Sequence, residues 1–64
     1  MASQSEILSI LPHDPMHAMD KWQMASILHD QSGLTSYSMR LKKLHLAGMV
    51  DYKDVGRKRF WWAI

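Results

Sequence analysis

Residues 34–48 read LTSYSMRLKKLHLAG, a segment whose apolar side chains recur with the period of an α-helix. When its residues are placed about 100° apart, one sector is apolar and holds Leu34, Tyr37, Leu41, Leu44 and Gly48. The opposite sector is polar, basic and exposed, and it holds Thr35, Ser36, Met39, Arg40, Lys42, Lys43 and Leu46. Thr35 or Ser36 suits the N-cap, and Gly48 suits the stop. We therefore predict a helix over about 35–47.

After Gly48 the polarity alternates with a period of two, which indicates β-strands. Residues 54–57, DVGR, form a turn in which Gly56 can adopt a positive φ. We predict a two-stranded antiparallel hairpin with a basic tip over about 53–60. In its second strand we expect Phe60 and Trp62 to anchor the hairpin onto the helices. Trp61, on the opposite face, is expected to be partly exposed.

A first helix begins at a capping box formed by Ser3 and Glu6, and Pro12 ends it. The next residues, PHDP at 12–15, form a loop, because two prolines within four positions prevent regular structure. We expect a brief extended segment over 16–19.

A second helix begins at Asp20, where Gln23 completes another capping box. Gly33 is well placed as the stop of this helix. The apolar side of the helix is expected to consist of Trp22, Met24, Ala25, Ile27 and Leu28.

Charge is distributed unevenly along the chain. Residues 1–34 hold one base against four acids, a net charge of −3, and residues 35–64 hold seven bases against two acids, a net charge of +5, which together give the overall +2. The bases of the second half fall on the exposed helix face and at the hairpin tip. Positive charge on two protrusions of a small domain is typical of a surface that binds a polyanion. Nucleic acid is the first candidate for this polyanion.

Length and composition restrict the class of protein. Sixty-four residues make a single domain, 1–64, and a hydrophobic share of 47% argues against disorder. The absence of cysteine excludes disulfides and cysteine-based zinc sites. No apolar run approaches the roughly 18 residues that span a membrane, and no secretory signal is evident. We expect a cytoplasmic, nucleoid-associated protein without membrane contact.

The sequence offers no catalytic machinery. It contains no nucleophile–base pairing, glycine-rich phosphate loop or carboxylate pair, so we predict no enzyme, no cofactor and no small-molecule effector. His13 and His17 lie four apart beside Asp14, but Pro15 breaks the helix that would bring both onto one face. We therefore expect exposed loop histidines rather than a metal site.

The order of elements resembles a winged helix-turn-helix domain. Residues 41–50, LKKLHLAGMV, resemble the end of the recognition helix and the first wing strand in bacterial and archaeal regulators of that superfamily. Residues 56–61, GRKRFW, resemble the wing, where a Gly-Arg-rich tip leads into aromatic residues. The resemblance covers nearly the whole chain. It implies an α+β, mainly α fold: a three-helix winged helix-turn-helix with a C-terminal two-stranded β-hairpin wing.

The resemblance also implies a sequence-specific double-stranded DNA-binding protein, a small transcriptional regulator. Helix 35–47 would lie in the major groove, and hairpin 53–60 on phosphates or the minor groove. Arg40 is suited to bind guanine and Met39 to pack on a thymine methyl group. Lys42 and Lys43 would contact phosphates. The remaining expected contacts come from hydroxyls at the helix start and bases at the hairpin tip: Thr35, Ser36, Arg57, Lys58 and Arg59. 

Other functions stay open. A winged helix can join a protein complex without contacting DNA, and a basic helix face can be merely a solvated surface. The hairpin aromatics could instead stack on single-stranded DNA or RNA. A homodimer is expected for DNA binding, because one copy would bury only roughly 600–1,000 Å² on the duplex.

Overall fold

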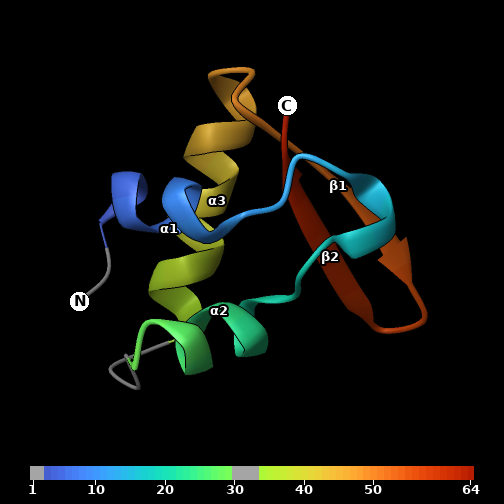
Figure 1. Cartoon of the computed structure of the whole chain (residues 1–64), viewed down its shortest axis with the longest axis horizontal. Coiled ribbons are helices and arrows are strands. Elements are labelled where there is room, and N and C mark those ends of the chain that lie inside the picture. The colour runs from blue at the N-terminus through green and yellow to red at the C-terminus, as the bar shows by residue number, and fades with distance from the viewer. Residues whose placement is uncertain (1–2, 30–33) are drawn as a thin grey trace.

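The structure is a computed structural model that describes residues 3–29 and 34–64. Within them the chain forms three α-helices, a short 3-10 helix and a two-stranded antiparallel hairpin. The elements are α1 (Gln4–Ile10), η1 (Pro15–His17), α2 (Lys21–Ile27), α3 (Leu34–Leu46), β1 (Val50–Val55) and β2 (Lys58–Ala63). This is the predicted mainly helical α+β layout of three helices and a hairpin wing. Figure 1 shows α3 between α1 and the hairpin, with α2 across the lower end of α3.

The core forms where α1, α2 and one face of the hairpin meet α3. Tyr37, Leu41 and Leu44 are buried, which confirms the apolar sector predicted for the third helix. Leu34, in the same sector, is partly buried and packs against this core. The other core residues come from all remaining elements except η1, and they are Ile7, Leu11, Met24, Ala25, Val50, Trp61 and Ala63.

Both predicted capping boxes are present. The Ser3 hydroxyl accepts a hydrogen bond from the Glu6 N–H (3.2 Å), and the Glu6 carboxylate accepts one from the Ser3 N–H (3.2 Å). At α2 the Asp20 carboxylate accepts from the Gln23 N–H (2.9 Å), and the Gln23 amide oxygen accepts from the Asp20 N–H (3.1 Å). These reciprocal bonds satisfy N–H groups that have no partner inside the helix.

The end of α2 differs from the expectation. The helix ends at Ile27, and His29 adopts a left-handed φ of 53°. A residue in that region cannot continue a right-handed helix, so the chain turns away there. Gly33, the predicted stop, lies outside the described residues.

The two ends of α3 differ in how well the sequence predicted them. Because the helix already includes Leu34, Thr35 and Ser36 lie inside its first turn and do not cap it, which corrects the predicted start. The predicted stop is confirmed: Gly48 has a φ of +75°. Its N–H donates to the His45 carbonyl (3.0 Å), and the Met49 N–H donates to the Leu44 carbonyl (3.0 Å), the paired bonds of a Schellman motif.

The hairpin has its predicted strands, but the faces of the second strand are exchanged. The turn is the two residues Gly56-Arg57, with Gly56 at a φ of +63°. This short turn pairs Tyr52 with Trp61, and residues directly opposite each other share a face. Since Tyr52 faces the helices, Trp61 does so too and is only 6% exposed. The expectation of a partly exposed Trp61 is therefore wrong, and Phe60 and Trp62 lie on the outer face, half-buried.

The segment between α1 and α2 borders β2 rather than forming its own strand. Met19 exchanges two backbone hydrogen bonds with Trp61, at 2.9 and 2.7 Å, so only this residue of the predicted extended segment pairs. Residues 15–17 instead form η1, because Pro15 fixes φ at a helical value and Asp14 caps the turn through the Met16 N–H (2.9 Å).

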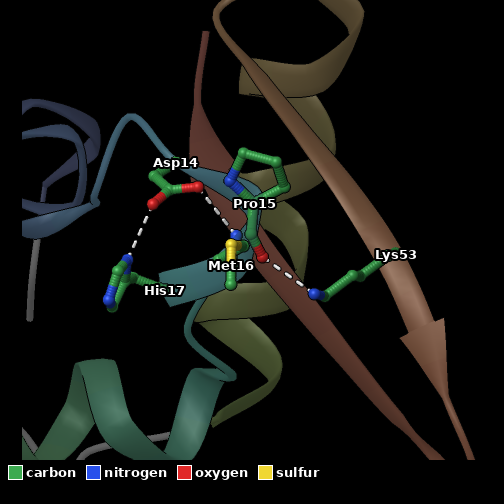
Figure 2. Close-up of polar contacts among 5 residues, drawn as sticks. All are labelled: Asp14, Pro15, Met16, His17 and Lys53. Carbon is green, nitrogen blue, oxygen red and sulfur yellow. Dashed lines mark hydrogen bonds and ion pairs between the residues drawn. The ribbon is translucent and has the colours of Figure 1, made fainter.

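Figure 2 shows how η1 is attached to the hairpin. The Lys53 ammonium donates a hydrogen bond to the Pro15 carbonyl at 2.8 Å. On the other side of the turn, His17 Nδ1 lies 2.7 Å from the Asp14 carboxylate. Lys53 is thus held on the outer face of the hairpin, away from the basic cluster described next.

Candidate nucleic-acid interface

An open hollow lies between the exposed flank of α3, the start of α2 and the inner face of the hairpin. Its lining includes five bases and two acids, a net charge of +3 with histidine neutral. The bases come from all three walls, namely Lys21 on α2, Lys42 on α3, and Arg57, Lys58 and Arg59 on the hairpin. Elements that are distant in the sequence thus gather their cations around one concave surface.

The base of the hollow is aromatic. Tyr52 lies between His45 and Trp61, with ring centroids 5.0 and 4.9 Å away. His45 Nδ1 also lies 3.1 Å from the Val50 carbonyl, at the start of β1. Rings in edge-to-face and tilted contact at these distances stabilise one arrangement of α3 and the hairpin, which carry them. This cluster therefore sets the angle between α3 and the hairpin, and with it the width of the hollow.

Arg59 is held within the hairpin. Its guanidinium donates to both oxygens of Asp54, at 2.7 and 3.2 Å, in a two-bond ion pair between facing strands. Its central carbon lies 4.1 Å from the centroid of the Tyr52 ring. Because a carboxylate and a ring already satisfy this cation, Arg59 shapes the hollow more than it contributes free positive charge.

Lys21 and Lys58 connect the walls of the hollow to one another. The Lys21 ammonium donates to the Ser38 hydroxyl at 3.3 Å, which joins α2 to α3. The Lys58 ammonium lies 3.7 Å from the buried carboxylate of Asp20, which joins the hairpin to α2. Asp20 therefore caps α2 and also pairs with the hairpin. Both lysines still line the hollow, so they remain available to an anion there.

Lys42 and Arg57 are the exposed bases of the hollow without a partner. Neither makes a hydrogen bond or ion pair with any residue in 3–29 or 34–64. They stand on opposite walls, one on α3 and one at the hairpin turn. These two cations consequently carry the positive charge that is most available to a ligand.

Exposure divides the polar side of α3 into stripes. Four exposed residues, which we call the α3 crest, follow one another at helical spacing: Thr35, Met39, Lys42 and Leu46. With residues about 100° apart, Arg40 points about 130° from the centre of the crest, away from the hollow. Lys43 and Ser36 lie on that same far flank, whereas Ser38 and His45 lie on the hollow side.

The residues predicted for DNA contact are thus only partly brought together. Lys42, Arg57, Lys58 and Arg59 line the hollow, and Thr35 and Met39 share the crest with Lys42. Ser36, Arg40 and Lys43 lie on the far flank, where Arg40 also donates to the Ser36 carbonyl at 3.4 Å. Sequence reasoning missed Lys21 and Trp22 on α2 and Ser38 on α3, because only the packing of α2 and the hairpin against α3 shows which flank borders the hollow.

Residues 3–29 and 34–64 bring no three histidine, aspartate or glutamate side chains together as a metal ion would require. Among the described helices, none combines the length and apolar character needed to cross a membrane.

No protein-family model matches the chain, and searches of the curated proteins and of the solved structures gave no match. The site is therefore interpreted from its own geometry.

The ion pair beside the hollow predicts a pH-dependent stability. The hydrogen bond from Arg59 lowers the pKa of Asp54 below its ordinary value. A lowered folded-state pKa stabilises the protein above the unfolded pKa of about 4, and this stabilisation is lost as pH falls through the folded value. We expect Asp54→Asn to be less stable than wild type at pH 7, with the difference shrinking towards pH 2. Urea unfolding across that range measures it.

A second variant checks the cause. Arg59→Gln removes the other half of the pair, so its stability should depend on pH as that of Asp54→Asn does. Asp14, whose pKa is also lowered, by the Met16 N–H and by His17, keeps its share of the acid dependence in both variants. A constant gap between wild type and Asp54→Asn from pH 7 to pH 2 would contradict the prediction.

Proposed function

We propose that this chain binds double-stranded DNA in a sequence-specific manner, as a small transcriptional regulator of winged helix-turn-helix type. The observation that supports the proposal is the hollow, where α2, α3 and the hairpin all present basic side chains. The lining has a net charge of +3, and it borders the exposed face of α3, a helix of 13 residues. A helix of this width fits the major groove, and adjacent cations neutralise phosphates along its edge. In this arrangement the crest of α3 faces the edges of the DNA base pairs.

Lys42 takes the base-reading position in this proposal. It is the only cation on the α3 crest, and it faces the hollow without a partner among the described residues. An ammonium in that position can donate to the O6 and N7 acceptors of guanine. Arg40, the base reader expected from the sequence, would face the groove wall instead, because its side chain projects from the far flank.

The phosphate contacts come from both walls of the hollow. Arg57 and Lys58 at the hairpin tip would bind the backbone beside the groove, and Lys21 would bind it from α2. Trp22, next to Lys21, is more than half exposed, and its indole N–H would donate to the same strand. Because one copy would bury only roughly 600–1,000 Å² on the duplex, we propose that two copies bind each site.

Salt dependence tests this proposal directly. The sequence alone suggests five to seven phosphate contacts. These would give a slope of about −5 to −6 when the logarithm of the association constant is plotted against the logarithm of the salt concentration. Because Arg59 is paired with Asp54 and Lys42 is assigned to a nucleobase, we expect about three phosphate contacts per copy, from Lys21, Arg57 and Lys58, and a slope of about −3 for each bound copy. Anisotropy titrations of a labelled duplex between about 50 and 200 mM salt measure it, with single-stranded DNA and structured RNA as competitors.

A protein-interaction module is the second candidate, and one observation favours it. Three large apolar side chains on the α2–α3 side are exposed: Trp22 at 57%, Met39 at 58% and Leu46 at 79%. Trp22 and Leu46 both line the hollow, and a large exposed apolar patch marks a surface for a partner protein. A folded protein that binds none of the three nucleic acids at 50 mM salt would support this candidate and contradict DNA binding.

A further inference from the structure

The composition of the α3 crest is unusual for a surface surrounded by cations. Two of its four side chains, Met39 and Leu46, are large, apolar and more than half exposed. Lys42 lies between them on the same stripe. The crest therefore presents one ammonium flanked on both sides by apolar groups, rather than a row of hydrogen-bond donors.

The spacing of these groups matches the floor of a major groove. Met39 and Leu46 are seven residues apart, which is about 10 Å along the helix axis. That distance spans about three base steps at 3.4 Å each. The one apolar group that base pairs display in the major groove is the C5-methyl group of a pyrimidine. Side chains without hydrogen-bonding groups can be accommodated there by packing on such methyl groups.

The charge around the crest favours this ligand over an apolar protein surface. The centre of a protein–protein contact is depleted of charged residues, whereas here Lys42 interrupts the apolar pair. Leu46 and Lys42 also line the hollow with its net charge of +3. A polyanion that carries methyl groups meets both properties at once.

We propose that Met39 and Leu46 recognise pyrimidine C5-methyl groups in the major groove, so that methylated pyrimidines about three steps apart are preferred. The inference rests on the proposed DNA binding and names what the crest selects. The methyl group is provided by thymine or by 5-methylcytosine, and the two sources are separated by experiment.

Two pairs of labelled 24-base-pair duplexes test the inference, each differing only in the methyl group. One pair is alternating d(AT) and d(AU); the other is alternating d(GC) and the same duplex with 5-methylcytosine. Burial of one methyl group by each side chain is expected to favour the methylated member roughly tenfold. If the methylated duplex is preferred only between d(AT) and d(AU), the contact is with thymine. If the methylated duplex is preferred in both pairs, the contact is with the C5-methyl group of either pyrimidine.

Matched variants identify the side chains. Met39→Gln with Leu46→Gln replaces two apolar side chains by polar ones of similar size and keeps helix propensity, so the variant should remain folded by circular dichroism and lower the methyl preference to about one. Met16→Ala removes an apolar side chain that is as exposed but lies on η1, and it should keep the wild-type preference. Equal binding within both pairs by the wild type, or an unchanged preference in the double variant, overturns the inference while duplex binding stands. Failure to bind any of the four duplexes overturns the proposed function as well.

Discussion

Replacement of Trp61 by alanine is expected to cost about 3–5 kcal/mol of folding free energy, the usual range for a buried large aromatic residue. The indole is almost fully buried and packs against Tyr52 and His45, at the junction of the hairpin with α3. A domain of this length has roughly 3–10 kcal/mol of stability in total. The variant should therefore be largely unfolded or close to it at 25 °C, as measured by urea unfolding followed by far-ultraviolet circular dichroism.

Trp62→Ala is the matched control, since it removes the same side chain from the next position of the same strand. Trp62 lies on the outer face, opposite Asp51, and is only half-buried. Its loss should cost less than half as much as that of Trp61, because less apolar surface returns to water. A larger loss for Trp62 than for Trp61 would mean that the hairpin packs with the face first inferred from the sequence.

These two tryptophans show which part of the fold a sequence could not fix. Aromatic residues at 60, 61 and 62 supply an apolar side chain to both faces of the strand, so alternation alone does not choose between them. The choice depends on the two-residue turn, which pairs Tyr52 with Trp61, and on Met19, which binds the backbone of the same residue. Both are contacts between segments far apart along the chain.

Local features were predicted much better, because their causes lie within a few residues. The capping boxes of α1 and α2 need only a side chain and a backbone group three positions apart. The apolar sector of α3 follows from helical period, and its end follows from Gly48, whose positive φ a glycine adopts without strain. The end of α2 lacked such a signal, since no glycine stands at 29, where the chain adopts a positive φ.

Of the residues expected to contact DNA, the folded chain places Lys42, Arg57, Lys58 and Arg59 around the hollow and leaves Ser36, Arg40 and Lys43 on the far flank of α3. The polar sector derived from helical period holds the crest and the far flank of α3, but not Ser38 and His45, which face the hollow. Which flank meets the hairpin is decided by the contacts of His45 with Val50 and Tyr52. These contacts turn Lys42 towards the hollow and Arg40 away from it. Similarly, the pairing of Arg59 with Asp54 is visible only once the strand register is known.

The Lys42→Glu variant is expected to bind duplex DNA about 100-fold more weakly than wild type. The change removes a base contact that is worth about 1–3 kcal/mol. It also places a carboxylate at the rim of the hollow, where it would repel the phosphates. The folded state should be unaffected, because Lys42 is exposed and has no partner among the described residues. Anisotropy titration at 100 mM salt measures the affinity, and discrimination between duplexes of different sequence should weaken as well.

Lys43→Glu provides the control, with the same change of net charge one residue along the same helix. Lys43 is exposed on the far flank, so its replacement should weaken binding to all duplexes by tenfold or less, through general electrostatics. Arg40→Ala distinguishes the two orientations of α3. If Arg40→Ala or Lys43→Glu lowers affinity more than Lys42→Glu does, the far flank enters the groove, and the hollow beside the hairpin is not where the duplex lies.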